Sequence, residues 1–174
     1  MAFGNTIDGI GFRVLDERAI RASAGLMFLL GLVASINGFV LNRYEVVPYI
    51  SGFLAINFII GIFINANYAP TYLLARLIVR NQTPIYIGAI QKRFAWSLGL
   101  GLSAVIFGLS LKLQTDATMF DSVCLLCIIC LVLLFSEASF GICIGCKIYQ
   151  SFVKIGIMKE PESKPNCMGD TCEV

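Results

Sequence analysis

Four long apolar segments bounded by charged residues constrain this chain most. They cover approximately 22–41, 46–68, 94–113 and 122–146. Each is close to the roughly 20 residues that a helix needs to cross the hydrocarbon of a bilayer. In lipid a helix satisfies its own backbone hydrogen bonds, so segments of this kind fold as helices. The sequence therefore predicts an all-α fold, an integral membrane four-helix bundle.

The positive charges predict the orientation of this bundle. Of the 13 Lys and Arg residues, all but Arg43 and Lys112 lie before the first span, between the second and third spans, or after the fourth. Basic residues concentrate on the cytoplasmic side of membrane proteins. We therefore expect both termini to be cytoplasmic, with residues 1–158 as the transmembrane domain and 159–174 as a flexible cytoplasmic tail. About twenty mixed-charge residues precede the first span, which argues against a cleaved signal peptide.

Composition excludes several kinds of function. The chain has no histidine, which removes the usual general base, the Ser-His-Asp and Cys-His nucleophile systems and the commonest metal ligand. A net charge of +2 is too small to indicate nucleic acid binding. Chemistry, if there is any, must therefore use cysteine, carboxylates, lysine, tyrosine or a cofactor that the sequence does not identify.

All seven cysteines lie in the last third of the chain: Cys124, Cys127, Cys130, Cys143, Cys146, Cys167 and Cys172. Two C-x-x-C pairs separated by fifteen residues imitate a zinc-ribbon spacing. On one helix, however, a rise of about 1.5 Å per residue separates these pairs by roughly 25 to 30 Å. One ion cannot bridge that distance, so no metal site is assigned. Soft-metal handling by one pair with the tail cysteines stays a weaker alternative.

A thiol redox or sulfur-transfer role fits the spacing better, because helix residues three apart lie within disulfide reach. Position along a continuous fourth helix favours Cys124, in the first turn, as the nucleophile. Cys143 and Cys146 would then lie near the last turn, where the helix dipole opposes a thiolate. A helix break at Gly141 or Gly145 would make them reactive, and inert packing of all the thiols is the other possibility.

Glu137 is a carboxylate inside the fourth span, where a charge costs several kcal/mol unless it is paired or hydrated. We expect it to face the bundle interior, with Asn57, Ser97 and Ser103 as candidate partners, and to carry a proton or to act as a structural carboxyl. Six residues separate it from Cys143, about 240° around an unbroken helix. On such a helix the two side chains would not share a face.

Three segments carry a family resemblance: LDERAIRASAG (15–25), KRFAWSLGLG (92–101) and SEASFGICIGCKIYQ (136–150). They resemble an uncharacterised family of four-span bacterial inner-membrane proteins, a domain of unknown function whose last span ends in Phe-Gly-x-Cys-x-x-Cys. The matching residues are Arg18, Arg21, Arg93, Phe94, Glu137, Gly141, Cys143, Gly145 and Cys146. The resemblance implies a place in the bacterial cytoplasmic membrane and thioredoxin-like or sulfur-carrier proteins as partners beside the lipid bilayer. The sequence departs from the family pattern in two places. One is the set of outer cysteines near the start of the fourth span, Cys124, Cys127 and Cys130, and the other is the cysteine-bearing tail.

These observations favour a membrane protein that handles thiols or sulfane sulfur, either as a redox relay or as a transporter of a small sulfur species. The residues expected to carry this chemistry are Cys143, Cys146, Glu137 and Cys124. A non-enzymatic scaffold or assembly subunit with structural cysteines is the alternative. Whether the chain is an enzyme, and how many copies assemble, stay open at this point.

Overall fold

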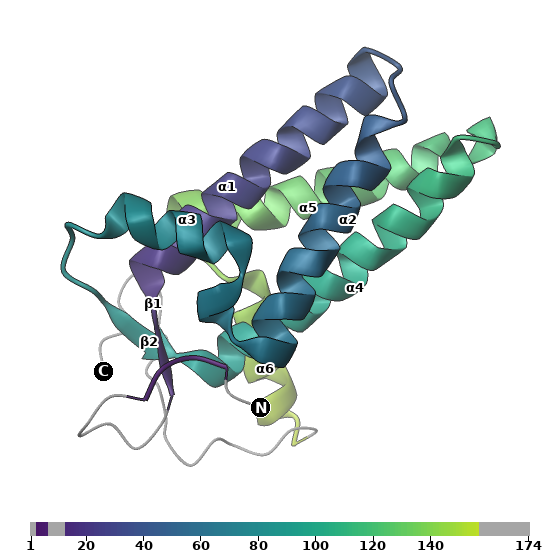
Figure 1. Cartoon of the computed structure of the whole chain (residues 1–174). Coiled ribbons are helices and arrows are strands. Elements are labelled where there is room, and N and C mark those ends of the chain that lie inside the picture. The colour runs from purple at the N-terminus through teal and green to yellow at the C-terminus, as the bar shows by residue number, and fades with distance from the viewer. Residues whose placement is uncertain (1–2, 7–12, 157–174) are drawn as a thin grey trace.

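The computed structural model describes residues 3–6 and 13–156, and it has the all-α fold that the sequence predicts. In this part of the chain four helical segments are long and apolar enough to cross a membrane (Figure 1). They are α1 (Glu17–Ser35) with a π-helical continuation (Ile36–Val40), α2 (Val46–Ile59) with a second one (Ile60–Ile64), α4 (Ala89–Leu113) and α5 (Phe120–Phe140). The expected tail, with Cys167 and Cys172, lies outside the described residues.

Shorter elements gather at one end of the bundle, which we call the strand end (Figure 1). They are strand β1 (Val14–Asp16), strand β2 (Tyr86–Gly88), α3 (Pro70–Val79), α6 (Ile144–Lys154) and a 3₁₀ turn (Ala66–Tyr68). The opposite end, the loop end, holds the short connections 41–45 and 114–116 and a second 3₁₀ turn (Ala117–Met119).

The two strands pair in antiparallel register, with Leu15 opposite Ile87. Both of these side chains are only 1% exposed. Strand β1 runs directly into α1, and β2 runs directly into α4. The Asp16 side chain accepts the Arg18 N–H at 3.1 Å and so caps α1. The β1–β2 pair therefore joins the starts of α1 and α4, and it fixes the first turn of α4 at the strand end.

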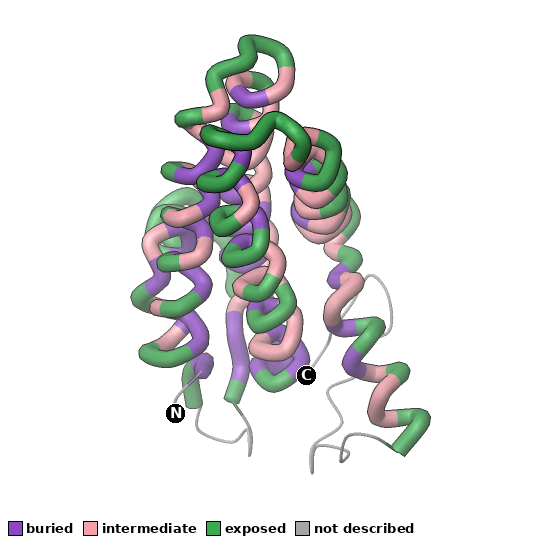
Figure 2. Tube along the Cα trace, turned by 90° about the vertical axis from the view of Figure 1, so that its right-hand side faces the viewer, coloured by how far each residue is buried: buried purple, intermediate pink, exposed green. Residues whose placement is uncertain are grey.

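Each helix buries one face and exposes the other (Figure 2). Ile20, Leu54 and Trp96 belong to a core at the strand end. Val47, Ile106 and Val123 belong to a second core at the loop end. On the outer faces large apolar side chains are exposed, including Leu29, Val40, Ile56, Phe63, Val105, Leu125 and Val132. Outward apolar surface of this extent fits a lipid bilayer rather than water.

A buried polar network joins α1, α2 and α3. Asn57 Oδ1 accepts the backbone N–H and the hydroxyl of Thr71, both at 3.0 Å. The Thr71 hydroxyl lies 2.8 Å from that of Ser23. The Asn57 side-chain nitrogen, which a carboxylate would need as donor, donates instead to Met27 Sδ at 3.6 Å, so the expectation that Asn57 pairs with Glu137 was wrong. Buried side-chain amides are stable when they are hydrogen-bonded in this way.

Candidate functional site

The last transmembrane helix breaks just before Cys143 and Cys146, which we call the inner cysteine pair. Helix α5 ends at Phe140, and Gly141 adopts a left-handed conformation with φ +68°. The N–H groups of Gly141 and Ile142 bond back to the carbonyls of Glu137 and Ser136 at 3.1 and 3.2 Å. Glycine reaches this conformation without the steric cost of a Cβ atom. The span expected at 122–146 is therefore two helices. The sequence analysis left open a helix break at Gly141 or Gly145, and the structure has the break at Gly141.

A cation from α1 stabilises this break. Arg21 Nη2 donates to the carbonyl oxygen of Ser139 at 3.0 Å. The last carbonyls of a helix carry partial negative charge and have no partner within the helix, so a guanidinium there is favourable. A Cβ atom at Gly141 would lie 3.3 Å from Arg21 Nη1. Arg21, one of the residues behind the family resemblance, thus fixes where α5 ends.

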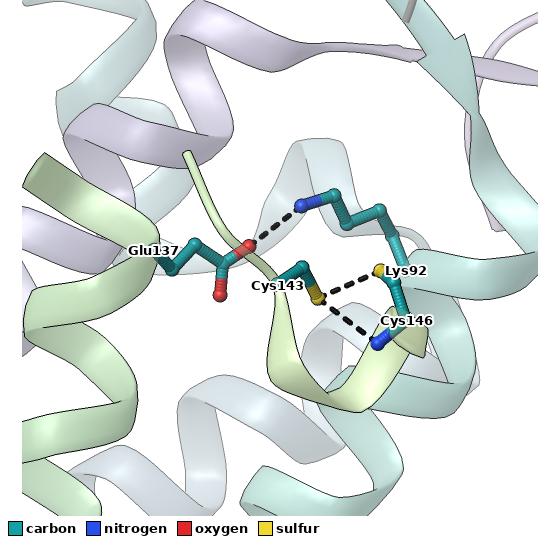
Figure 3. Close-up of polar contacts among 4 residues, drawn as sticks. All are labelled: Lys92, Glu137, Cys143 and Cys146. Atoms are coloured by element: carbon teal, nitrogen blue, oxygen red, sulfur yellow. Dashed lines mark hydrogen bonds and ion pairs between the residues drawn. The ribbon is translucent and has the colours of Figure 1, made fainter. Parts of the chain in front are cut away.

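Cys143 is the N-cap residue of the new helix, α6 (Figure 3). Its backbone is extended, with φ −87° and ψ 100°, and its Sγ accepts the backbone N–H of Cys146 at 3.3 Å. The two Sγ atoms are 2.7 Å apart. Cys143 therefore caps the start of a helix and Cys146 lies in its first turn, so neither lies in the last turn of the preceding helix. The expectation that the helix dipole opposes a thiolate here was wrong, and the dipole now favours Cys143.

Close packing against α4 holds the start of α6 in place. A Cβ atom at Gly145 would lie 2.8 Å from the Ala95 Cα, so only glycine allows the two backbones to approach this closely. Further along α6, Tyr149 packs on Phe94 with ring centroids 5.5 Å apart. Cys143 and Cys146 are 9% and 7% exposed. The pair is thus nearly enclosed between α4 and α6.

Glu137 pairs with Lys92, which was not among its expected partners. Lys92 Nζ donates to Glu137 Oε1 at 2.8 Å, and the two side chains are only 7% and 15% exposed. Instead of meeting Glu137, Ser97 and Ser103 donate to the carbonyls of Arg93 and Leu100 within their own helix. Those two expected partners were therefore also wrong. The sequence did contain a signal for this ion pair, because a carboxylate buried in a membrane span requires an opposite charge nearby.

The helix break brings this ion pair and the thiols together, although Glu137 and Cys143 would not share a face on an unbroken helix (Figure 3). The hydrogen bond from the Cys146 thiol lowers the pKa of Cys143, and Lys92 acts in the same direction, while burial and Glu137 oppose them. The same hydrogen bond, followed by burial, raises the pKa of Cys146. One thiol of the pair therefore loses its proton more readily than the other.

A cavity of about 110 Å³ adjoins this cluster. Cys143, Glu137 and Cys130 contribute to its wall, and the remainder is almost entirely apolar. The site therefore combines a dithiol, a buried ion pair and an apolar chamber.

The outer cysteines have different surroundings. Cys124 is half-buried, Cys127 is buried, and Cys130 is half-buried. All three lie within the continuous helix α5, which begins at Phe120, so Cys124 comes just after the first turn rather than in it. Within 3–6 and 13–156 no three His, Cys, Asp or Glu side chains are placed to hold a metal ion. Only Cys130 among these three thiols lines the cavity beside the inner pair.

Comparison with known proteins identifies a family for this chain. The family model described as "Domain of unknown function (DUF4395)" matches residues 15–154. No curated protein and no solved structure matches the chain. The matched range contains all four long helices, the ion pair and the inner cysteine pair.

Proposed function

The chain belongs to the DUF4395 family, and we propose that it handles thiols or sulfane sulfur in a membrane, with Cys143 and Cys146 as the working pair. The observation that carries this proposal is the N-cap position of Cys143, whose Sγ accepts two hydrogen bonds from Cys146. Helix N-termini and Cys-x-x-Cys spacing are the surroundings in which thiolates form most readily. In this proposal Cys143 is the attacking thiolate and Cys146 the resolving thiol.

The redox step needs a disulfide or another two-electron acceptor as the co-reactant. Cys143 attacks one sulfur of a small disulfide, its S–S bond breaks, and one thiol leaves with a proton. Cys146 then attacks Cys143 Sγ, forms the Cys143–Cys146 disulfide and releases the second thiol. The pair is oxidised by two electrons, and the small disulfide is reduced by two.

Lys92 and Glu137 have supporting roles in this scheme. The Lys92 ammonium stabilises negative charge on Cys143, and Glu137 keeps that ammonium in place. Glu137 also lines the cavity beside Cys143, where a carboxylate can accept a proton released in the exchange. We propose no catalytic role for Cys124, which lies inside α5, away from the helix start that favours Cys143.

The test uses purified protein in which the other five cysteines are replaced by alanine. We expect 4,4′-dithiodipyridine to release two equivalents of thiopyridone from the reduced pair, because Cys146 resolves the first mixed disulfide. Cys146→Ser should release one equivalent and keep a mixed disulfide on Cys143. Cys143→Ser should react far more slowly, because burial still raises the pKa of Cys146 once the Cys143 thiol is gone. Equal reaction of the two single-cysteine proteins would contradict the proposal.

Alkylation and mass spectrometry of membranes from growing cells separate the two versions of the proposal. A redox relay leaves a disulfide between Cys143 and Cys146, with the loss of two hydrogens. Sulfur transfer adds one sulfur atom to Cys143. A scaffold predicts neither mass change, and predicts that a folded protein without cysteines keeps its cellular role.

A further inference from the structure

We infer that the cavity beside Cys143 receives the ring of a lipid-soluble quinone, which takes two electrons from the Cys143–Cys146 dithiol. This inference rests on the proposed function and names its oxidant by chemical class. It draws on the size of the cavity, the chemistry of its wall, its position beside the bilayer and the polar groups at one end.

The cavity has the size of one ring. Its volume of about 110 Å³ is below the roughly 300 to 1,000 Å³ of pockets for drug-sized ligands. An apolar cavity of roughly 150 Å³ is known to bind benzene. A single six-membered ring therefore matches the space, and a peptide or a nucleotide does not.

The wall of the cavity selects for an uncharged, apolar molecule. Met27, Phe58 and Trp96 contribute to it, and so does the polar side chain of Glu137, which lies near Cys143 (Figure 3). Burying a charge in such surroundings is strongly unfavourable without a partner. A charged water-soluble disulfide is therefore a poor occupant, whereas a quinone ring carries only two carbonyl oxygens that accept hydrogen bonds.

The position of the cavity gives access from the bilayer. Two of its lining residues, Leu98 on α4 and Ile148 on α6, are themselves 45% and 38% exposed on the outside of the protein. Leu98 lies within a helix long and apolar enough to cross the membrane. A molecule dissolved in the hydrocarbon therefore meets the outer wall of the cavity at these two side chains.

The chemistry balances with no further reactant. The Sγ atoms of Cys143 and Cys146 join in one S–S bond as their two protons are lost. Two electrons pass to the quinone ring, and two protons reach its oxygens, which gives the hydroquinone. The Glu137 carboxylate is the group on the cavity wall that can receive a thiol proton and pass it to a quinone oxygen.

The experiment uses the full chain in nanodiscs of phosphatidylcholine, with Cys143 and Cys146 as the only cysteines, reduced and kept free of oxygen. Tetramethyl-1,4-benzoquinone is the probe, because its substituted ring offers no position for thiol addition. We expect one quinone to be reduced for each disulfide formed, read from quinone absorbance and from alkylation. No quinone reduction by a pair that reacts normally with 4,4′-dithiodipyridine would overturn this inference and leave the proposed function standing.

Matched variants test the place of binding. Leu98→Trp should close the entrance and slow oxidation by the quinone at least tenfold. Leu111→Trp, at a similarly exposed position (47%) on the same helix near the loop end, should leave the rate unchanged. With alanine as the reference residue at position 130, Cys130→Phe should fill the chamber and slow the reaction as well. Equal rates in all these proteins, with unchanged reaction toward 4,4′-dithiodipyridine, would overturn the assignment to this cavity.

Discussion

The strand end and the loop end each carry cysteines three residues apart, but the backbone around them differs. Near the loop end, Cys124 and Cys127 lie on the uninterrupted helix α5. At the strand end, Cys143 stands outside the first turn of α6, with its Sγ toward the N–H of Cys146. Spacing alone therefore does not distinguish a packing thiol from a nucleophile. The start of a helix supplies the unpaired N–H groups that stabilise a thiolate.

The two ends also differ in the surroundings of their lysines. Lys112 is exposed in the last turn of α4, where its charge complements the helix dipole. Lys92 is buried in the first turn of that helix, where the dipole opposes a cation, and it depends on Glu137 instead. One helix thus carries a solvated cation at one end and a paired, dehydrated cation at the other. The loop end supplies matched controls for changes at the strand end.

The largest effect is expected from breaking the ion pair. Lys92→Met should lower the free energy of unfolding by about 3 to 5 kcal/mol, because it leaves the Glu137 carboxylate buried without its partner. Lys112→Met should change it by less than about 0.5 kcal/mol, since that side chain is exposed. Reversible unfolding in detergent gives both values.

A double variant separates pairing from packing. Replacing Lys92 by Met and Glu137 by Leu together should recover most of the lost stability, because an apolar pair of similar volume often equals a buried ion pair. It should still slow the reaction of Cys143, which loses the nearby ammonium. If the double variant were less stable than Lys92→Met alone, the carboxylate would have another stabilising contact, and our account of the pair would be wrong.

The length and apolar character of the spans were enough to predict the four-helix fold, because the bilayer sets both. The site was only partly predictable. Charge counting assigned Lys92 to a loop, since the third span was expected to begin at residue 94, whereas α4 begins at Ala89. Depth alone suggested Asn57 as a partner for Glu137, but it does not give the direction in which a side chain points around its helix.

The helix break illustrates a second limit of the sequence. Glycine at position 141 is compatible with a continuous helix, at a cost of about 1 kcal/mol relative to alanine, and with a left-handed helix end. Contacts from elsewhere in the chain decide between these two states. Arg21 on α1 binds the carbonyl of Ser139, 118 residues away in sequence, and favours the break. A local pattern therefore offers both alternatives, and a distant contact selects one of them.

A smaller effect is expected where α6 approaches α4. Gly145→Ala places a Cβ atom 2.7 Å from that of Ala95, and overpacking of this kind typically costs about 1 to 3 kcal/mol. The shift of α6 should also slow the reaction of Cys143 with 4,4′-dithiodipyridine. Gly101→Ala is the control, because no heavy atom outside its own stretch of helix lies within 4 Å of the added methyl group. Equal stability of the two variants, measured as above, would mean that the close approach is not required.

The difference between a thiol at a helix start and an ordinary thiol is tested most finely by the pH dependence of alkylation, because the alkylation rate reports the thiolate directly. The hydrogen bond from Cys146 lowers the pKa of Cys143, so the rate at Cys143 should rise at a lower pH than for an ordinary thiol. Cys146→Ala removes the side-chain donor and should move the curve to higher pH, whereas Cys146→Ser keeps an O–H donor and should move it less. Lys92→Met should also move it upward, and Glu137→Gln downward, by the signs of their charges. Identical curves for the alanine and serine variants would show that the backbone N–H and Lys92 suffice, and that the Cys146 side chain does not activate its neighbour.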